Sequence, residues 1–305
     1  MISFVNAKIN IGLQIVRKRE DGYHDLETLF YPIGLYAGTP NNPTPFCDIL
    51  EIVSEKERQA DCNPKNENLP EFLFAGRSID CALEKNLVYK AADLFCRDTG
   101  ADLRDLQIIL EKHLPDGAGL GGGSADAAFT LKMLAEIFNS RNPQKRITDK
   151  TLYEMALKIG ADCPFFILNR PAFAEGVGER LDKILLDLTG YTLLLVKPDI
   201  YVSTKDAFSG VVPRKSDFDL RHLADLPIEK WRGVVKNDFE DSIFPKFPGI
   251  KKVKERIYSH GAIYASMSGS GSSVYGIFGD EVQAAKALND FKDESTIEAC
   301  YLLKM

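Results

Sequence analysis

Apolar and polar residues alternate near the start of the chain, which is typical of a β-strand. The apolar positions are Val5, Ala7, Ile9, Ile11, Leu13 and Ile15, and the polar positions between them are Asn6, Lys8, Asn10 and Gln14. We therefore expect a strand with one buried face and one solvated face. Asp21 and Gly22, followed by an apolar run, predict a turn and a second strand that pairs with the first.

Further along the chain, several segments have apolar residues at the spacing of an α-helix. The sequence predicts helices at residues 86–100, 124–139, 149–160 and 251–261, and strands at residues 106–114, 172–181 and 192–198. Residues 161–168, with Pro164, are expected to form a turn that leads into a strand. The polar stretches 39–48 and 61–71 are expected to be surface loops. Because new strands follow residue 169, we expect two domains, residues 1–169 and 170–305.

Five glycines fall within residues 117–123, in the stretch PDGAGLGGGSADAA. An expected strand precedes them and an expected helix follows, so unpaired backbone amides and the positive end of a helix dipole coincide there. Gly121, Gly122 and Gly123 can aim successive amides at one anion, and a phosphate is the expected ligand. Lys112, at the end of the strand, could supply a cation. The alternative is a turn that needs glycine for its backbone angles alone.

Composition narrows the class of partner. The chain has 38 Lys and Arg against 44 Asp and Glu, a net charge of -6, so it has no general attraction for nucleic acid or anionic membranes. A small-molecule partner is expected. No apolar run approaches a membrane span and no signal peptide is recognised, which predicts a cytoplasmic protein. The six cysteines form no C-x-x-C pair, so we expect free thiols.

The glycine-rich stretch resembles the second motif of the GHMP kinases, which phosphorylate small alcohols with ATP. AKINIGLQIVRKREDGYHDLETLF (residues 7–30) and SMSGSGSSVYGIF (residues 266–278) resemble the first and third motifs of this family. GADCPFF, AFAEGVGE and KNDFE add to the likeness, which runs nearly end to end. DGYH and GADCPFF resemble the members whose acceptor is a methylerythritol linked to cytidine diphosphate, phosphorylated on its 2-hydroxyl.

The resemblance implies an α+β, two-domain GHMP kinase fold. The expected N-terminal domain is like the second domain of ribosomal protein S5 and binds ATP, and the expected C-terminal domain is ferredoxin-like and binds substrate. ATP and Mg²⁺ are the implied cofactors.

The resemblance also assigns roles to individual residues. The implied catalytic residues are Lys8 and Asp162, and the implied substrate-binding residues are Asn10, Tyr23, His24 and Asp162. The implied nucleotide-binding residues are Asn86, Lys112, Gly117, Gly119, Leu120, Gly121, Gly122, Gly123 and Ser124. Ser124 is also the implied ligand of Mg²⁺, and Tyr23 and His24 would recognise cytidine.

Local sequence leaves other interpretations open. Asp162 could be a turn or cap residue, Asn86 an N-cap, and Lys8, Tyr23 and His24 ordinary surface residues. The serine-rich residues 268–273 could approach phosphates or simply connect two strands. Alternative functions are a GHMP kinase for mevalonate, homoserine or a sugar, and a nucleotide-binding regulator without turnover. A serine hydrolase lacks support because no G-x-S-x-G elbow occurs.

Overall fold

Two compact units make up the chain in the computed structural model, which describes residues 1–39, 42–54, 68–79 and 81–305. The first unit contains Met1–Asn6, Cys47–Leu114 and Gly122–Asn169, and the second contains Ala7–Phe46, Pro115–Gly121 and Arg170–Met305. Residues 7–46 belong to the second unit because their hairpin pairs with a strand that follows residue 170. The sequential division into residues 1–169 and 170–305 therefore stays a prediction, although one limit falls at Asn169.

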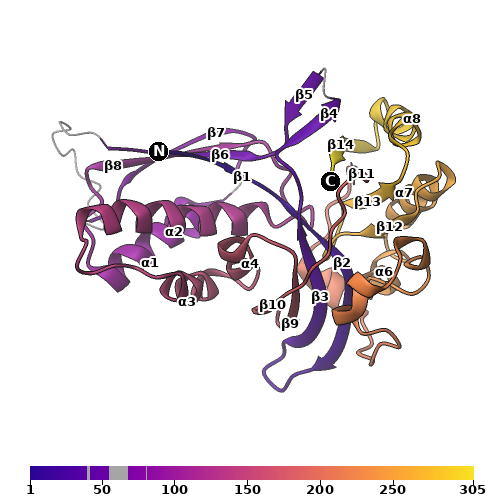
Figure 1. The fold of residues 1–305 in the computed structure, drawn as a ribbon, viewed down its shortest axis with the longest axis horizontal. Coiled ribbons are helices and arrows are strands. Elements are labelled where there is room, and N and C mark those ends of the chain that lie inside the picture. Colours follow the sequence, from indigo (N-terminus) through magenta and orange to yellow (C-terminus); the bar gives the residue numbers. More distant parts are fainter. Residues whose placement is uncertain (40–41, 55–67, 80) are drawn as a thin grey trace. The chain divides into compact units, whose positions relative to one another are not determined.

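The first unit is a four-stranded sheet with helices on one face (Figure 1). The strand order is β1 (Ile2–Val5), β6 (Asp48–Ser54), β8 (Leu106–Lys112) and β7 (Glu71–Gly76). The helices are η1 (Leu83–Lys85), α1 (Leu87–Thr99), α2 (Gly122–Arg141), α3 (Asp149–Ile159) and α4 (Cys163–Leu168). Alanines and large apolar residues of α2 are buried, so this helix is central to the core of the unit.

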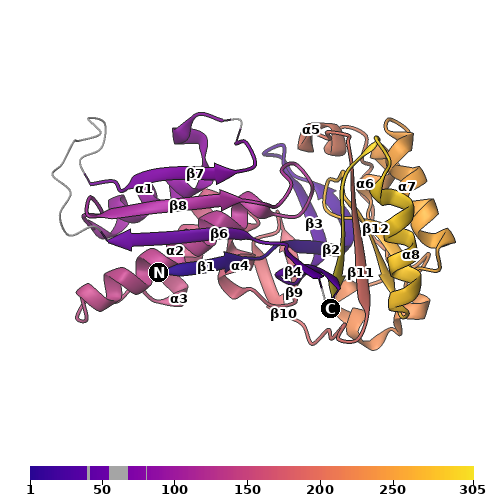
Figure 2. The same cartoon turned by 90° about the horizontal axis from the view of Figure 1, so that it is seen from above.

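The second unit has two sheets, and helices pack on the larger one (Figure 2). The smaller sheet has the order β10 (Arg180–Lys183), β9 (Ala172–Gly176), β3 (His24–Pro32) and β2 (Lys8–Lys18). The larger has the order β12 (Tyr264–Met267), β13 (Val274–Phe278), β11 (Thr192–Pro198), β14 (Ile297–Lys304), β4 (Tyr36–Thr39) and β5 (Asn42–Pro45).

The helices of this unit are short except for two. They are α5 (Thr204–Phe208), η2 (Leu220–Asp225), η3 (Ile228–Lys230), α6 (Phe239–Ile243), α7 (Pro248–Ser259) and α8 (Glu281–Lys292). Apolar residues of α7 and α8 join those of β11 and β13 in one hydrophobic core. No helix in the described ranges is long and apolar enough to cross a membrane.

Four local predictions are wrong, the first being the single strand at residues 172–181, which is divided into the antiparallel strands β9 and β10. Residues 163–168 form α4 instead of a turn, because Pro164 occupies the first turn of a helix, where its missing N–H does no harm. Within 39–48, residues 42–45 form β5, an edge strand that tolerates proline. The polar side of the first strand is buried as well as the apolar side, since Asn6, Lys8, Asn10 and Gln14 are all almost inaccessible.

The remaining loop prediction lies mostly outside the described residues, because 61–67 are not described. The predictions of the first hairpin and of the helices at residues 86–100 and 149–160 are confirmed, the helices themselves being Leu87–Thr99 and Asp149–Ile159. The helix expected from residue 124 begins two residues earlier, at Gly122. Cys47, Cys81, Cys96, Cys163 and Cys300 are free thiols, as expected.

Candidate active site

Lys8 lies at the start of β2, and its ammonium group contacts the glycine-rich segment. Its Nζ donates to Oδ1 of Asn10 at 2.6 Å and to the carbonyl oxygen of Gly119 at 3.2 Å. The ring of Phe30 lies 5.0 Å away, measured from Nζ to the ring centroid. The backbone N–H of Lys8 donates to the carbonyl oxygen of Leu120. Lys8 is 3% exposed, so the interpretation of it as a solvated surface lysine is wrong.

Asn10 orients Lys8 within the strand. Its Oδ1 accepts from the lysine, and its Nδ2 donates to the hydroxyl of Thr28 at 2.9 Å. Both ends of the amide are therefore engaged inside the protein. The substrate contact expected of Asn10 stays a prediction.

The serine-rich residues 268–273 contact the same glycine. The Ser268 hydroxyl donates to the carbonyl oxygen of Gly119 at 2.8 Å and accepts from the N–H of Asn10 at 3.3 Å. Gly119 has φ +73°, and a Cβ there would collide with the Ser268 carbonyl oxygen. Backbone conformation and close approach thus both require glycine at this position. The loop is a tight connection that also holds the glycine-rich segment.

His24 and Tyr23 lie at the turn of the β2–β3 hairpin. The imidazole of His24 stacks on Phe208, with ring centroids 4.9 Å apart and an interplanar angle of 21°. Partial burial, together with Lys18, lowers the pKa of His24, so the ring is neutral at pH 7. Tyr23 is 66% exposed and presents its ring to solvent. The sequence pattern did not single out Phe208, which joins His24 only through the fold.

The glycine-rich segment continues from the second unit into α2 of the first. Gly117, Gly119 and Gly121 have positive φ, so the turn needs glycine at these positions. Gly122 and Gly123 begin the helix, and a Cβ on either would meet only ordinary van der Waals contacts, with nothing closer than 3.4 Å. Neither conformation nor crowding explains these two glycines. Their bare amides at a helix N-terminus suit the approach of an anion.

Lys112 ends β8 next to this helix, buried in a cluster with two carboxylates. Its Nζ lies 2.5 Å from Oδ2 of Asp48 and 2.8 Å from Oδ2 of Asp126. Oδ1 of Asp48 accepts from the N–H groups of His113 and Leu114. The cluster therefore ties β6, the end of β8 and α2 together.

Burial and the carboxylates act in opposite directions on these charges. Burial lowers the pKa of Lys112, but the two carboxylates outweigh burial and the net pKa is raised. Burial raises the pKa of Asp126, against the pull of Lys112. Oδ1 of Asp126 has no hydrogen-bond partner among the described residues. The phosphate contact expected of Lys112 stays a prediction, and the geometry favours a role in fixing the start of α2.

Asp162 and Ser124 belong to neighbouring helices of the first unit. Asp162 immediately precedes α4, and its side chain makes no N-cap hydrogen bond, which disfavours the interpretation as a cap. Burial raises the pKa of the adjacent Cys163 to about 12, with a hydrogen bond from Ser124 acting in the opposite direction. The Cys163 thiol is therefore un-ionised. The contact from Ser124 to Cys163 brings the first turn of α2 to the residue beside Asp162.

Asn86 combines a structural role with a place in a pocket wall. Its side chain accepts the N–H of Val88 at 2.8 Å, so it is the N-cap of α1. It also lines a pocket of about 410 Å³ in the first unit. The other lining residues are Phe72, Phe74, Ala75, Gly76, Arg77, Ser78, Ile79, Cys81 and Leu83. The two aromatic rings among them suit a flat aromatic ligand.

A resident metal site built from the usual side chains is not found in the described part of the chain. No group of three or more His, Cys, Asp or Glu residues there could hold a metal ion. Any metal bound would depend on oxygen atoms of a ligand, as Mg²⁺ commonly does with phosphates.

Comparison with known proteins identifies the family. Residues 86–170 match the GHMP kinases N terminal domain, and residues 228–295 match the GHMP kinases C terminal domain. A 4-diphosphocytidyl-2-C-methyl-D-erythritol kinase of Bacteroides fragilis is 46% identical over 288 residues, 94% of this chain and 95% of the relative. The enzyme of the same name from Cytophaga hutchinsonii is 37% identical and covers 98% of both chains.

Solved structures agree with this relationship. A crystal structure of 4-(cytidine 5'-diphospho)-2C-methyl-D-erythritol kinase superposes with a TM-score of 0.75, at 30% identity and full coverage of both chains. Mevalonate kinase from Methanococcus jannaschii has a TM-score of 0.65 at 12% identity, with 100% of this chain and 98% of that chain covered, which shows a shared fold alone. The predicted α+β, two-domain fold is confirmed, and the chain is a small-molecule kinase that uses ATP. The chain belongs to the GHMP kinase family, and within it to the 4-diphosphocytidyl-2-C-methyl-D-erythritol kinases.

Proposed function

We propose that this enzyme transfers the γ-phosphoryl group of ATP to the 2-hydroxyl of 4-diphosphocytidyl-2-C-methyl-D-erythritol, in the non-mevalonate route to isoprenoid precursors. The observation that carries the proposal is the 46% identity over 94% of the chain to a kinase of that name. The local geometry within each unit supports the proposal, because Lys8 is held by hydrogen bonds and the glycine-rich segment leads into the N-terminus of α2. The cytoplasmic location expected from the sequence stays a prediction.

The phosphates of ATP bind at residues 117–124 in this proposal. The amides of Gly122 and Gly123 lie at the start of a 20-residue helix, where backbone donors and the helix dipole favour an anion. The side chain of Leu120 is buried, so Leu120 contributes backbone only. The hydroxyl of Ser124 and phosphate oxygens would bind Mg²⁺, which would neutralise charge on the phosphates.

The transfer itself uses one acid–base group and one cation of the chain. Asp162 orients the 2-hydroxyl and accepts its proton as the new P–O bond forms and the bond from the γ-phosphorus to the bridging oxygen of ADP breaks. Lys8 stabilises the negative charge that develops on the moving phosphoryl group. Asn10 and Gly119 hold its ammonium group in place.

The two bases of the substrates use different surfaces. Cytosine is recognised at Tyr23 and His24: the neutral imidazole offers one donor and one acceptor, and Tyr23 offers an aromatic face. The ring of Phe208 stacks on one face of the imidazole and fixes its plane. Adenine occupies the pocket lined by Phe72, Phe74 and Asn86.

The test is a direct assay with ATP, Mg²⁺ and the cytidyl substrate, following ADP release and the phosphorylated product by mass spectrometry. Mevalonate, homoserine and galactose serve as parallel acceptors. Product is expected with the cytidyl substrate alone. Turnover of another acceptor would keep the family but remove the cytidine role of Tyr23 and His24, and ATP binding without turnover on any acceptor would favour a regulator.

The Asp162→Asn variant tests the proposed base. Loss of a general base typically lowers the rate about 100-fold to 10,000-fold, and we expect a fall in kcat within that range. Asp149→Asn is the matched control, because Asp149 is an exposed aspartate in the first turn of α3 in the same unit. Equal activity of the two variants would contradict the assignment of Asp162.

A further inference from the structure

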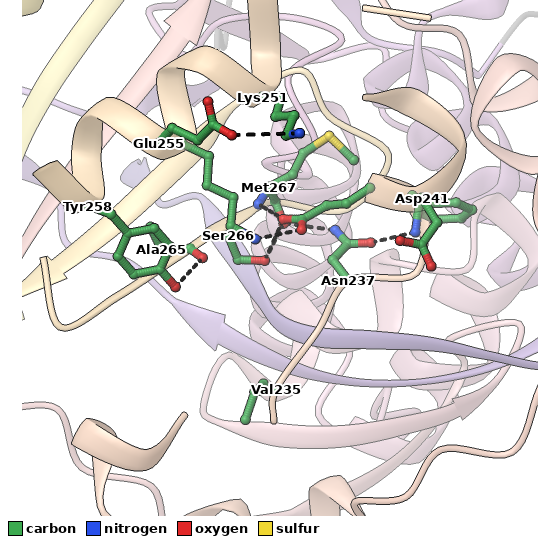
Figure 3. Close-up of polar contacts among 12 residues, drawn as sticks. Val235, Asn237, Asp241, Lys251, Glu255, Tyr258, Ala265, Ser266 and Met267 are labelled. Carbon is green, nitrogen blue, oxygen red and sulfur yellow. Dashed lines mark hydrogen bonds and ion pairs between the residues drawn. The ribbon is translucent and has the colours of Figure 1, made fainter. Parts of the chain in front are cut away.

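The KNDFE segment, residues 236–240, has no role in the reaction described so far, yet the side chains of Asn237 and Glu240 are buried in a hydrogen-bond network. Asn237 is 2% exposed. Its Nδ2 donates to the carbonyl oxygen of Met267 at 2.8 Å (Figure 3). Its Nδ2 also donates to the carbonyl oxygen of Gly269 at 2.8 Å, and its Oδ1 accepts the N–H of Phe239 at 3.0 Å. With both donor hydrogens and the acceptor engaged, the amide has one fixed orientation.

These bonds fall at a specific point of the fold, where β12 ends and residues 268–273 begin. Glu240 holds the same strand end from the other side. Its Oε1 accepts the N–H of Met267 at 2.9 Å and the hydroxyl of Ser266 at 3.2 Å, and Lys254 pairs with its Oε2. Asn237 is the member of the segment that reaches past the strand to Gly269.

Residues 268 and 269 in turn determine the environment of Lys8. Ser268 donates to the carbonyl oxygen of Gly119, which is also an acceptor for the ammonium group of Lys8. Gly269 lies close to the same amide, because a Cβ on Gly269 would be 3.2 Å from Oδ1 of Asn10, which also accepts from Lys8. A shift of residues 267–269 would move Ser268, and with it the contacts of Ser268 to Gly119 and to the backbone of Asn10, two residues that accept from Lys8.

We propose that Asn237 is a positioning residue for phosphoryl transfer: it fixes residues 267–269, which hold Gly119 and Asn10 and so set the place of the Lys8 ammonium group. The inference rests on the proposed function, because it concerns the cation used in that reaction. The segment affects the rate by fixing the position of the Lys8 ammonium group, without touching the substrates itself. A displacement of about 1 Å in a catalytic group can lower the rate about 100-fold.

The first test is Asn237→Asp, which keeps the shape and the acceptor for Phe239 but replaces the donors with an oxygen that faces two carbonyl oxygens. We expect kcat to fall about tenfold to 100-fold, while KM for ATP and for the cytidyl substrate changes less than about threefold. A loss confined to kcat distinguishes misplacement of a group that acts in the transition state from weaker substrate binding.

Tyr258→Phe is the matched control. The Tyr258 hydroxyl donates to the carbonyl oxygen of Ala265 at 3.2 Å, in the same strand but two residues before Met267 (Figure 3). The variant loses a bond to the backbone of β12 without touching residues 267–269. We expect a drop in Tm with kcat within about twofold of the wild type.

A second variant keeps the test valid if Asn237→Asp does not fold. Ser268→Ala removes the contact between this loop and Gly119, and the same loss confined to kcat is expected. If both variants fold, the double variant should lose less than the product of the two single effects, because both act on one contact chain. Unchanged kcat in Ser268→Ala, or kcat in Asn237→Asp equal to that of the control, would overturn the inference.

Different assay results would contradict this inference and the proposed function. An inactive wild type with the cytidyl substrate counts against the proposed function. An active wild type with an equally active Asn237→Asp variant overturns the positioning role alone.

Discussion

Lys8 and Lys112 are two lysines with the same degree of burial next to the two ends of one glycine-rich segment, but their partners differ. Each is 3% exposed and each belongs to a strand. Lys8, in the second unit, contacts the carbonyl oxygen of Gly119. Lys112, in the first unit, lies 3.4 Å from the position that a Cβ on Gly122 would take.

The partners indicate what each charge does. Lys112 pairs with Asp48 and Asp126, so its charge is balanced within the fold and joins three elements. Lys8 donates to the side-chain oxygen of Asn10 and to the carbonyl oxygen of Gly119, which orient its ammonium group at the glycine-rich segment. Burial of a strand lysine therefore does not reveal its function, whereas the chemistry of its acceptors does.

Of the variants that test this comparison, Lys112→Met should have the largest effect, a loss of free energy of unfolding. Removing the lysine leaves the Asp48 carboxylate buried beside Asp126 without a cation, and breaking a buried ion pair in this way costs about 3–5 kcal/mol. Urea unfolding of the variant should show this loss. The control is Lys158→Met, which removes an exposed ion pair with Asp98 in the same unit and should cost less than about 1 kcal/mol. Equal effects would show that the buried cluster does not stabilise the fold.

Lys8→Met should mainly affect catalysis. Loss of a group that stabilises transition-state charge typically lowers kcat about 100-fold to 1,000-fold, and Met keeps the length of the aliphatic chain. The fall in Tm should be smaller than for Lys112→Met. Lys183→Met, at an exposed position of β10 in the same sheet, is the control for loss of a positive charge. If Lys8→Met unfolds the protein as Lys112→Met does, the contrast between the two lysines is wrong.

Asp126→Asn should have the smallest effect, and a pH-dependent one. Burial raises the pKa of Asp126 to about 8 in the folded protein, against an ordinary value of 3.8. A raised carboxyl pKa means that the folded state holds the proton more tightly than the unfolded state. The contribution of this group to stability is therefore complete below about pH 3.8 and is lost as the pH rises through about 8.

The comparison of wild type and variant isolates this group, because all other titrating residues are shared. We expect the urea midpoint of the wild type to fall between pH 5 and pH 8 more steeply than that of Asp126→Asn. Parallel midpoints across this range would mean that Asp126 is ionised throughout and that the cluster carries two negative charges.

Local patterns predicted the elements whose stability comes from nearby residues. Helix α1 has its N-cap at Asn86 and its left-handed Gly100 at the other end, and both signals lie within the segment itself. The β2–β3 hairpin has Asp21 and Gly22 in its turn. The glycine-rich segment and the following helix were likewise recognisable, since glycine and alanine have opposite backbone preferences.

The errors arose where distant residues decide the environment. The sequence alternation predicted a solvated side for the first strand, but Gly119 and Ser268 cover that side at Lys8 and Asn10. Residues 161–168 were expected to form a turn at Pro164, but residues 163–168 form helix α4, which packs against α2 and α3. Asp48 and Phe208 carried no local signal, because their partners Lys112 and His24 are far away in the sequence.

The sequence by itself determined the family, the glycine-rich segment at the start of α2 and the residue types available for catalysis, because these depend on short motifs with fixed backbone requirements. Only the tertiary structure decided which of the buried polar groups are paired with which. A lysine has the same side chain at positions 8 and 112, and its charge takes its role from the acceptors that the fold brings to it across many residues of sequence.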